Sequence, residues 1–299
     1  MPRRFWKMSG AGNDFVVLPL DPQAAAEDVA GFVRSVCLRG LSVGADGVLF
    51  VSPVPGMGDA DARLVHFNSD GSRSEFCGNG SRCAARFTVA MGWAGPSVRL
   101  ATDVGILRAE VGGSMVRIEA PTPTTPAPVQ CRTQGATYEG WLLTAGVPHF
   151  VLRVDSVEEV DVAGIGPLLR SHTSLGPSGA NVDFLGPAQG GHHPIRTFER
   201  GVEAETLACG SGALAASRVL AALGERSPIR LKPTSGAELV VEFEGDPSEP
   251  RSFRLAGDAR IVFEGVLSDE AATAQGEGHS LPTAAGPSGH ADGTGGPAA

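Results

Sequence analysis

Short segments in which apolar and polar residues alternate recur along this chain of 299 residues. Alternation with a period of two, rich in β-branched and aromatic side chains, predicts β-strands. Apolar residues at helical spacing occur in fewer places. We expect strands over residues 14–18, 63–67, 106–111, 116–119, 150–154, 195–198, 239–243 and 260–263, and helices over residues 24–36, 80–91 and 212–223. Strand-rich halves with one prominent helix each are typical of an α+β fold.

Composition restricts the classes to which the protein can belong. Hydrophobic residues make up 42% of the chain and charged residues 19%, which is enough apolar material for a core. The formal net charge of -9 argues against a surface for nucleic acids or anionic membranes. Apolar runs are too short for a membrane span, and residues 1–13 lack the apolar core of a signal peptide. We therefore expect a cytoplasmic protein that binds neither nucleic acid nor membrane.

Changes in composition indicate the domain boundaries. From Ser268 onward, Leu281 is the only large apolar residue, so we expect residues 268–299 to form a disordered tail. Proline is dense between Pro121 and Pro128, where it cannot continue a helix or a central strand. We expect this segment to cross between two halves; the alternative is a long surface loop within one domain. The predicted domains are residues 1–125 and 126–267.

An internal repeat supports two related halves. The run that begins at Cys77 reads C-G-N-G-S-R-C-A-A-R, and the run that begins at Cys209 reads C-G-S-G-A-L-A-A-S-R. Cys, Gly, Gly, Ala and Arg stand at identical offsets in the two runs, and each run opens a predicted helix. The pair Phe67-Asn68 precedes the first run, and Phe198-Glu199 precedes the second at nearly the same distance. The repeat predicts two copies of one fold.

The two matched cysteines are the candidate reactive groups. Five cysteines without a Cys-x-x-Cys pair do not suggest a disulfide framework or a zinc site. Glycines at a helix start allow a ligand to approach the backbone, and the first N–H groups of a helix bind anions. A thiol there has a stabilised thiolate, so we expect its pKa to fall below the free value of about 8.5. The alternative is a pair of buried cysteines packed beneath glycine-rich turns.

If the halves face each other, the two thiols flank one cavity from opposite sides. One thiol can then remove a proton from one face of a carbon atom while the other returns a proton to the opposite face. This arrangement indicates a racemisation or epimerisation without a cofactor. Cys37, Cys83 and Cys131 lack such a context; we expect Cys83 to pack in the core, and Cys131 could be exposed.

These residues resemble the diaminopimelate epimerase family over nearly all of residues 5–265. Each matching segment is short and weak alone, but together and in this order they are specific. The segments are Lys7–Phe15, Gly44–Gly47, Phe67–Gly71, Cys77–Gly80, Gly146–His149, Asn181–Phe184, Glu199–Gly201 and Cys209–Gly212.

The resemblance implies a fold and a reaction. The fold is two similar domains, each a curved sheet around a central helix, with the active site in the cleft between them. The reaction is conversion of LL-2,6-diaminopimelate to the meso form, in lysine and peptidoglycan biosynthesis. The family uses neither pyridoxal phosphate nor metal, and it suggests a homodimer. Cys77 and Cys209 would form the acid and base pair, with Cys209 accepting and Cys77 donating the proton in the LL-to-meso direction.

The resemblance also implies a binding shell. The α-carboxylate would lie against the N–H groups of Gly78, Asn79, Gly210 and Ser211. Arg200 would hold the distal carboxylate and Glu199 an ammonium group. Asn13, Asn68 and Asn181 would supply further donors and acceptors. His149 and Glu199 match positions that tune the pKa values of the two thiols.

The chain departs from the family pattern at three places. Val147 replaces an asparagine, Gly47 replaces a glutamine found in some relatives, and the segment from Glu199 to Cys209 is one residue longer. These departures affect substrate recognition rather than the thiols. The alternatives are a racemase of the same fold that acts on another amino acid such as histidine, a redox protein in which Cys77 and Cys209 form a reversible disulfide, and a non-catalytic binding module.

Overall fold

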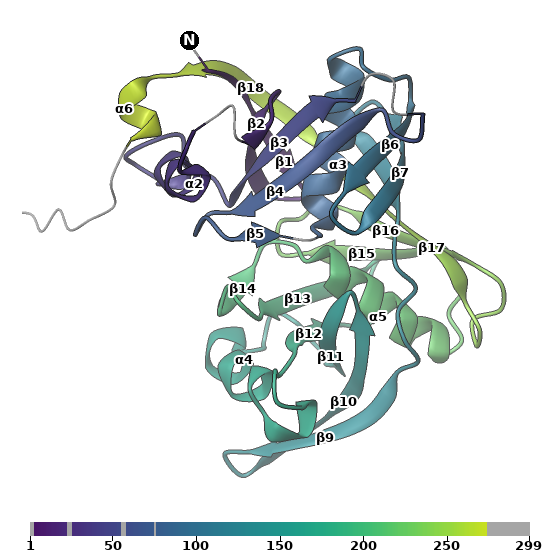
Figure 1. Cartoon of the computed structure of the whole chain (residues 1–299). Helices are drawn as coiled ribbons and strands as arrows, with labels where there is room; N and C mark the ends of the chain where they lie inside the picture. Colours follow the sequence, from purple (N-terminus) through teal and green to yellow (C-terminus); the bar gives the residue numbers. More distant parts are fainter. Residues whose placement is uncertain (1–2, 23–25, 55–57, 75, 274–299) are drawn as a thin grey trace, which may run out of the picture.

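The computed structural model describes residues 3–22, 26–54, 58–74 and 76–273, and within these ranges the chain forms two halves stacked end to end (Figure 1). The strands of the first half are β1 (Arg3–Gly10), β2 (Asn13–Leu18), β3 (Gly47–Pro53), β4 (Ala62–Asn68), β5 (Arg73–Ser74), β6 (Ser97–Thr102), β7 (Gly105–Gly112) and β8 (Met115–Glu119). Those that follow are β9 (Ala127–Thr133), β10 (Ala136–Ala145), β11 (Val147–Arg153), β12 (Asn181–Leu185), β13 (His193–Glu199), β14 (Ala204–Thr206), β15 (Ile229–Pro233), β16 (Leu239–Glu244), β17 (Arg251–Asp258) and β18 (Arg260–Leu267).

The described residues form fewer helices than strands, and the helices are short. They are α2 (Val29–Cys37), α3 (Gly78–Ala90), α4 (Val162–Arg170), α5 (Gly210–Ala222) and α6 (Asp269–Ala272), with a single 3₁₀ turn at Thr173–Leu175. No helix in the described part of the chain is long and apolar enough to cross a membrane.

The two halves repeat one pattern of strand pairing. In the first half β1–β2, β3–β4, β6–β7 and β7–β8 are antiparallel, whereas β2–β3 and β4–β6 are parallel. In the second half β10–β11, β12–β13, β15–β16 and β16–β17 are antiparallel, whereas β11–β12 and β13–β15 are parallel. Strands β10–β17 therefore repeat β1–β8 in order, and α5 takes the place of α3. This correspondence relates each strand of the first half to one strand of the second.

The halves are joined through equivalent strands. β8 pairs antiparallel with β17, so one sheet continues from the first half into the second. β18 returns to the first half and pairs with β1, while β9 pairs with β10 at the other end. The boundary predicted at residue 125 falls in residues 120–126, which lie between β8 and β9 and contain neither helix nor strand.

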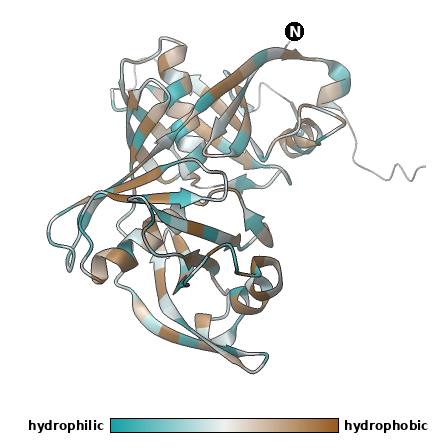
Figure 2. Ribbon diagram, turned by 180° about the vertical axis from the view of Figure 1, so that it is seen from behind, coloured by the Kyte–Doolittle hydropathy of each residue, from teal (hydrophilic) through white to brown (hydrophobic). Residues whose placement is uncertain are grey.

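The core lies around α3 and α5, which the curved strands surround (Figure 1). One cluster of buried side chains runs through both halves, and its members include Phe15 and Phe87 in the first half and Leu214 and Leu255 in the second. Along the strands, hydrophobic and hydrophilic residues alternate (Figure 2), as expected for strands that bury one face. Burial of this continuous core holds the two helix starts at a fixed separation.

The structure corrects two expectations about the elements. Helix α4 is absent from the prediction because Gly164, Gly166 and Pro167 interrupt its apolar pattern, although Asp161 caps its start. The predicted tail begins too early: Ser268 caps α6, and Ala272 packs beside α2 with 8% of its surface exposed. The short apolar side chains of α6 cover an existing cluster, which composition alone does not reveal. Residues 274–299 and the start of the helix predicted at residue 24 lie outside the described residues.

Candidate active site

The two matched cysteines occupy the same position at the starts of equal helices. Cys77 is the N-cap of α3 and Cys209 the N-cap of α5, and each helix is 13 residues long. The Sγ atom of each cysteine accepts a hydrogen bond from the N–H three residues later, Gly80 or Gly212, over 3.4 Å in both cases. A cap needs an acceptor that reaches back to the third N–H of the helix, and here the thiol takes the role of serine or aspartate.

The two helix starts meet across the junction of the halves. The amide Nδ2 of Asn79, in the first turn of α3, donates to the carbonyl oxygen of Ala208, the residue before Cys209, over 3.2 Å. Both helix starts also lie against one side chain of β17: a Cβ atom on Gly78 or Gly210 would lie 3.4 or 3.1 Å from Leu255 Cδ2. Glycine at these positions lets the two helix starts approach the same point.

Asn13, the first residue of β2, lies at this junction. Its Oδ1 lies 3.9 Å from Cys77 Sγ and 3.5 Å from the Nδ2 of Asn79, and its Nδ2 donates to Asp46 over 2.7 Å. Behind it, Lys7 and Arg39 contact Asp14 at 2.7 and 2.5 Å. Burial opposes ionisation of Asp14, but the Arg39 and Lys7 hydrogen bonds outweigh it and hold the pKa of that carboxyl well below its usual range. These contacts orient the Asn13 amide toward the thiol.

His149 is held in a buried chain of hydrogen bonds on the other side. Its Nδ1 lies 2.7 Å from the Oδ2 of Asp183, and neither side chain has any exposed surface. Its Nε2 lies 3.2 Å from the Nδ2 of Asn181, whose Oδ1 accepts from the backbone N–H of Arg200 over 2.7 Å. Because that N–H must face the amide oxygen, the Asn181 amide N–H faces Nε2, and the Nδ1 side of the ring faces Asp183.

Glu199 faces both thiols from the end of β13. Its negative charge disfavours ionisation of Cys77 and of Cys209. Burial raises the pKa of the Glu199 carboxyl, while the Thr206 hydroxyl and His149 oppose that rise. A half-buried carboxyl whose charge acts on both thiols is placed to tune their pKa values.

The thiols differ from the sequence expectation. Burial raises the pKa of Cys77 and raises that of Cys209 further, although the Gly80 and Gly212 N–H groups act in the opposite direction. The helix N-terminus favours the thiolate, but the loss of water around the sulfur disfavours it more strongly. Both thiols are therefore protonated at neutral pH in the form of the molecule described here.

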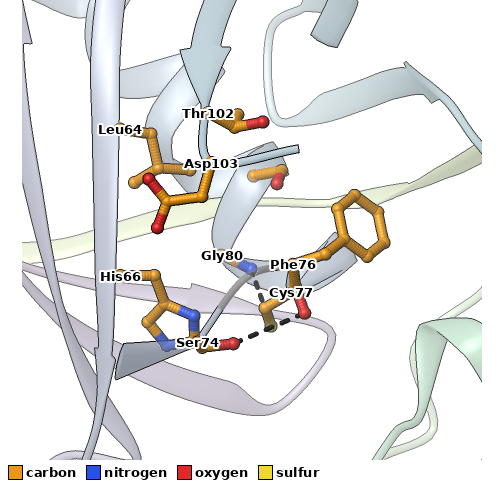
Figure 3. A pocket seen from close by; sticks show the side chains of 9 residues that line it. Leu64, His66, Ser74, Phe76, Cys77, Gly80, Thr102 and Asp103 are labelled. Carbon is orange, nitrogen blue, oxygen red and sulfur yellow. Dashed lines mark hydrogen bonds between the residues drawn. The ribbon is translucent and has the colours of Figure 1, made fainter. Parts of the chain in front are cut away.

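A small pocket opens on one side of Cys77 (Figure 3). Cys77, Ser74, Thr102 and Asp103 line it together with His66. His66 is buried, and neither ring nitrogen finds a hydrogen-bond partner among the described residues. Burial lowers the pKa of His66 to about 4, so its ring is neutral at physiological pH.

The remaining predicted residues lie at the edges of this arrangement. Asn68 is exposed and donates to Ser72 over 3.0 Å, so the structure does not bring its side chain to either thiol. Ser211 lies 3.3 Å from Cys209 Sγ through its hydroxyl. The Arg200 guanidinium reaches the carbonyl oxygen of Ser178 over 3.4 Å. Cys131 is fully buried rather than exposed, because it packs beneath α4, which was not predicted.

Two residues of the site escaped the sequence analysis. Asp183 lies within a segment that matches the family but was not singled out, because a carboxylate in a buried strand gives no periodic signal. Arg82 stands inside the repeat, but an arginine on a helix is usually solvated. In the structure Arg82 has no exposed surface, and its Nη2 donates to Asn79 over 2.8 Å. Within the described ranges, no three His, Cys, Asp or Glu side chains are grouped as metal ligands would be.

The sequence of the chain is similar to those of known proteins. The family model for diaminopimelate epimerase matches residues 5–118 and 141–261. A diaminopimelate epimerase of Aquifex aeolicus is 39% identical over 279 residues, which cover 89% of this chain and 98% of the relative. The chain belongs to the diaminopimelate epimerase family. A diaminopimelate epimerase of Archaeoglobus fulgidus is 36% identical over 88% of this chain and 95% of its own length.

More distant solved structures share the fold of this epimerase family. A phenazine biosynthesis protein of Bacillus anthracis superimposes with a TM-score of 0.67 at 14% identity, over 90% of this chain and 99% of that protein. A probable proline racemase of Agrobacterium radiobacter gives 0.66 at 15% identity, over 91% and 95%. The predictions of the family and of a two-half α+β fold are confirmed.

The strand correspondence explains where this member departs from the epimerase pattern. Register places Asn13 opposite Gly10 and Val147 opposite Ala145 in the equivalent strand pairs β1–β2 and β10–β11. Gly47 pairs with Phe15 in β2–β3, and Asn181 pairs with His149 in the equivalent strand pair β11–β12. Val147 and Gly47 are thus the partners, by pseudo-symmetry, of the two polar residues that remain. At each of these two positions, one member of a matched pair lacks a polar side chain.

Proposed function

We propose that this chain epimerises LL-2,6-diaminopimelate to meso-diaminopimelate with Cys77 and Cys209 as the two proton-transferring groups. The observation that carries the proposal is the meeting of two matched helix starts, each capped by a thiol, at the junction of the halves. The family membership supplies the substrate class. Cys77 and Cys209 would act on opposite faces of one carbon atom.

The chemistry balances with these two groups. One thiolate takes the α-proton, so the C–H bond breaks and an S–H bond forms, and the electron pair stays on the α-carbon and its carboxylate. The opposite thiol then gives its proton to the other face of that carbon and becomes the thiolate. Each turnover therefore exchanges the protonation states of Cys77 and Cys209. No group outside the chain is required for either proton transfer.

The first turns of α3 and α5 would receive the substrate carboxylate. The first N–H groups of a helix have no intrahelical partner, and both helix dipoles point their positive ends to the same place. The N–H groups of Gly78, Asn79, Gly210 and Ser211 are therefore placed to hold the α-carboxylate and the charge that develops on it. The Asn79 side chain is already engaged with Arg82 and Ala208, so this proposal uses its backbone only.

Binding of the substrate would also favour ionisation of a buried thiol, which can then act as a base. The α-ammonium group would bring a positive charge beside Cys77 and Cys209, and a nearby cation favours the thiolate. The α-ammonium group of the zwitterionic substrate would thus lower the pKa values that burial raises. At the distal end, Arg200 would bind the second carboxylate and Glu199 an ammonium group, with Asn13 and Asn68 as further contacts.

Incubation of the reduced protein with LL-diaminopimelate in D₂O tests the proposal. We expect meso product with deuterium at the inverted α-carbon, because the returning proton comes from a thiol that exchanges with solvent. Cys77→Ala and Cys209→Ala should each reduce epimerisation to less than a few per cent of the wild-type rate. Failure to form the meso isomer, or substantial epimerisation by either variant, would contradict the two-thiol proposal.

The distal carboxylate separates this substrate from other amino acids. Arg200→Met should lose turnover of diaminopimelate, because a bidentate partner for the second carboxylate is removed. Unchanged kinetics of that variant, together with racemisation of an amino acid such as histidine, would identify the alternative racemase.

We further propose that the enzyme is a cytoplasmic homodimer. All five cysteines are free, which suits a reducing compartment. Among the described residues, β18 pairs with β1 on one side only, and Val262, Phe263 and Val266 on it are exposed. An apolar edge strand is a surface that proteins usually cover. A second copy of the chain is the occupant that the family suggests.

A further inference from the structure

The two halves have diverged in the charges that surround their helix starts. Arg82 stands five residues after Cys77, and the equivalent residue five after Cys209 is Leu214. In the parallel strand pairs, Leu49 of β3 corresponds to Asp183 of β12, since Phe15–Gly47 matches His149–Asn181 two residues earlier. The first half thus has a cation where the second has leucine, and the second has an anion where the first has leucine.

Arg82 places a buried positive charge beneath Cys77. The guanidinium has no exposed surface, and its Nη1 has no hydrogen-bond partner in the described part of the chain. A Cβ on Gly78 would lie 4.0 Å from that Nη1, so the free N–H end points to the first turn of α3. Arginine does not lose its proton in proteins, so this charge is permanent. It favours the thiolate of Cys77.

Asp183 places a buried negative charge against the start of α5. A Cβ on Gly212 would lie 2.4 Å from its Oδ1, which shows that the carboxylate rests directly on the first turn. Thr197 donates to the same oxygen over 2.7 Å, and the Nδ1 of His149 lies 2.7 Å from the other. Within the described residues no lysine or arginine pairs with this carboxylate, and it disfavours the thiolate of Cys209.

The other charges near the thiols do not reverse this difference. Glu199 faces both Cys77 and Cys209 and disfavours both thiolates. Asp258 on β17 and Cys83 on α3 interact with Arg82, but Asp258 is also paired with Arg260 at its surface end. Around Gly80, the counterpart of Gly212, the nearest groups are the apolar side chains of Leu49 and Phe15.

We propose that Arg82 and Asp183 set the order in which the two thiols ionise, so that Cys77 loses its proton first and Cys209 keeps its own. This rests on the proposed two-thiol function, and it assigns the starting roles: Cys77 is the base and Cys209 the acid when the substrate-free site first holds one thiolate. Arg82 and Asp183 are positioning residues that act through the thiols. With the polarity that the family resemblance implies, this starting state is the one that accepts the meso isomer.

Alkylation of the reduced, substrate-free protein tests the order. Iodoacetamide is added at a series of pH values, and mass spectrometry measures the rate at which each cysteine is modified. The midpoint pH of each rate profile, rather than the rate itself, reports ionisation and is insensitive to the better access to Cys77. We expect a lower midpoint for Cys77 than for Cys209, since an opposite charge within a few ångströms typically lowers a pKa by about 1–3.

Variants assign the effect to the two charges. Arg82→Gln keeps an amide donor for Asn79 and should raise the Cys77 midpoint by about 1 pH unit or more, whereas Arg82→Lys should restore it. Asp183→Asn should lower the Cys209 midpoint. Arg86→Gln, one turn further along α3, is the matched control and should leave both midpoints in place, because Arg86 contacts Ala259 O rather than the helix start.

Equal midpoints in the wild-type protein, or a lower midpoint for Cys209, would overturn the assignment even if no variant folds. An unchanged Cys77 midpoint in Arg82→Gln would overturn the role of Arg82. Because the measurement needs no substrate, its failure is distinct from absence of diaminopimelate turnover.

Discussion

At the scale of single residues, the site depends on polar side chains that are buried away from water. His66 is the least compensated of them, because the interior surrounds its ring while both nitrogens lack partners within the described ranges. His149 shows the opposite case: it is also buried, but Asp183 and Asn181 engage both of its nitrogens. A buried polar group without partners reduces the free energy of unfolding, whereas one with partners fixes a geometry.

His66 should make the stability of the protein depend on pH. Burial lowers its folded pKa to about 4 from 6.5, so below pH 6.5 the unfolded chain binds a proton that the folded chain does not. Stability is fully present above pH 6.5 and falls as the pH decreases toward 4. The loss between pH 7.5 and pH 5 should be about 2 kcal/mol.

Chemical denaturation at these two pH values measures the effect. His66→Leu should remove this part of the pH dependence and be at least as stable as the wild type at pH 7.5. His172→Gln, which replaces a half-buried histidine bonded to Arg132 O, serves as the control. An identical pH dependence in His66→Leu and wild type would show that His66 gains its proton in the folded state.

At the scale of elements, the important features are the two helix starts and the strands that press on them. Each start is glycine-rich because something approaches it closely: Leu255 lies against Gly78 and Gly210, and the Asp183 carboxylate against Gly212. α3 and α5 also bury small side chains along most of their length, which allows the strands to wrap around them. The position of each thiol is therefore set by backbone packing rather than by its own side-chain contacts.

Gly212→Ala tests this dependence on packing. The added methyl group would lie 2.4 Å from Asp183 Oδ1 and 3.1 Å from Thr197 Oγ1, so the strand or the helix start must move. We expect a loss of stability of about 1–3 kcal/mol, as for other overpacked sites, and a loss of most epimerase activity. Thermal unfolding and the D₂O assay measure the two effects.

Gly95→Ala is the matched control, because a Cβ there meets nothing within 4 Å and the backbone is in an ordinary conformation. Wild-type stability and activity in Gly212→Ala would contradict the packing argument. Loss of activity with unchanged stability would show that the helix start tolerates the methyl group but the thiol does not.

At the scale of the whole molecule, duplication accounts for both the symmetry and the asymmetry of the site. The same order of strand pairing occurs twice, and equivalent strands β8 and β17 join the two copies. The copies then differ at the residues that face the thiols, which allows two chemically identical groups to take different roles. β18 closes the first half and leaves an apolar edge, where we place the second subunit.

The exposed edge predicts the effect of a surface charge on assembly. Val266 is 60% exposed on β18, so Val266→Glu should fold normally while disfavouring a homodimer through burial of a carboxylate. Sedimentation or light scattering should show a dimer for the wild type and a monomer for the variant. Val104→Glu, at a position that is 58% exposed on the turn between β6 and β7, should stay dimeric. A monomeric wild type, or a dimeric Val266→Glu, would refute the placement of the second subunit.

The sequence by itself determined the repeat, and with it the two thiols and the central helices that they open. This was possible because glycine-rich helix starts and alternating strands leave local, periodic signals. Ten of the eighteen strands, helix α4 and the structured residues 268–273 were not predicted, because short strands without alternation and a helix with Gly and Pro inside depend on what covers them.

Only the tertiary structure decided how the two thiols differ. Arg82 reads as a solvated helix residue and Asp183 as an ordinary strand residue until the fold buries both against the helix starts. The raised pKa values of Cys77 and Cys209 likewise come from removal of water, which no local pattern records. The burial of a group and the charges around it depend on residues that are distant in the chain, so they cannot be read from local sequence patterns.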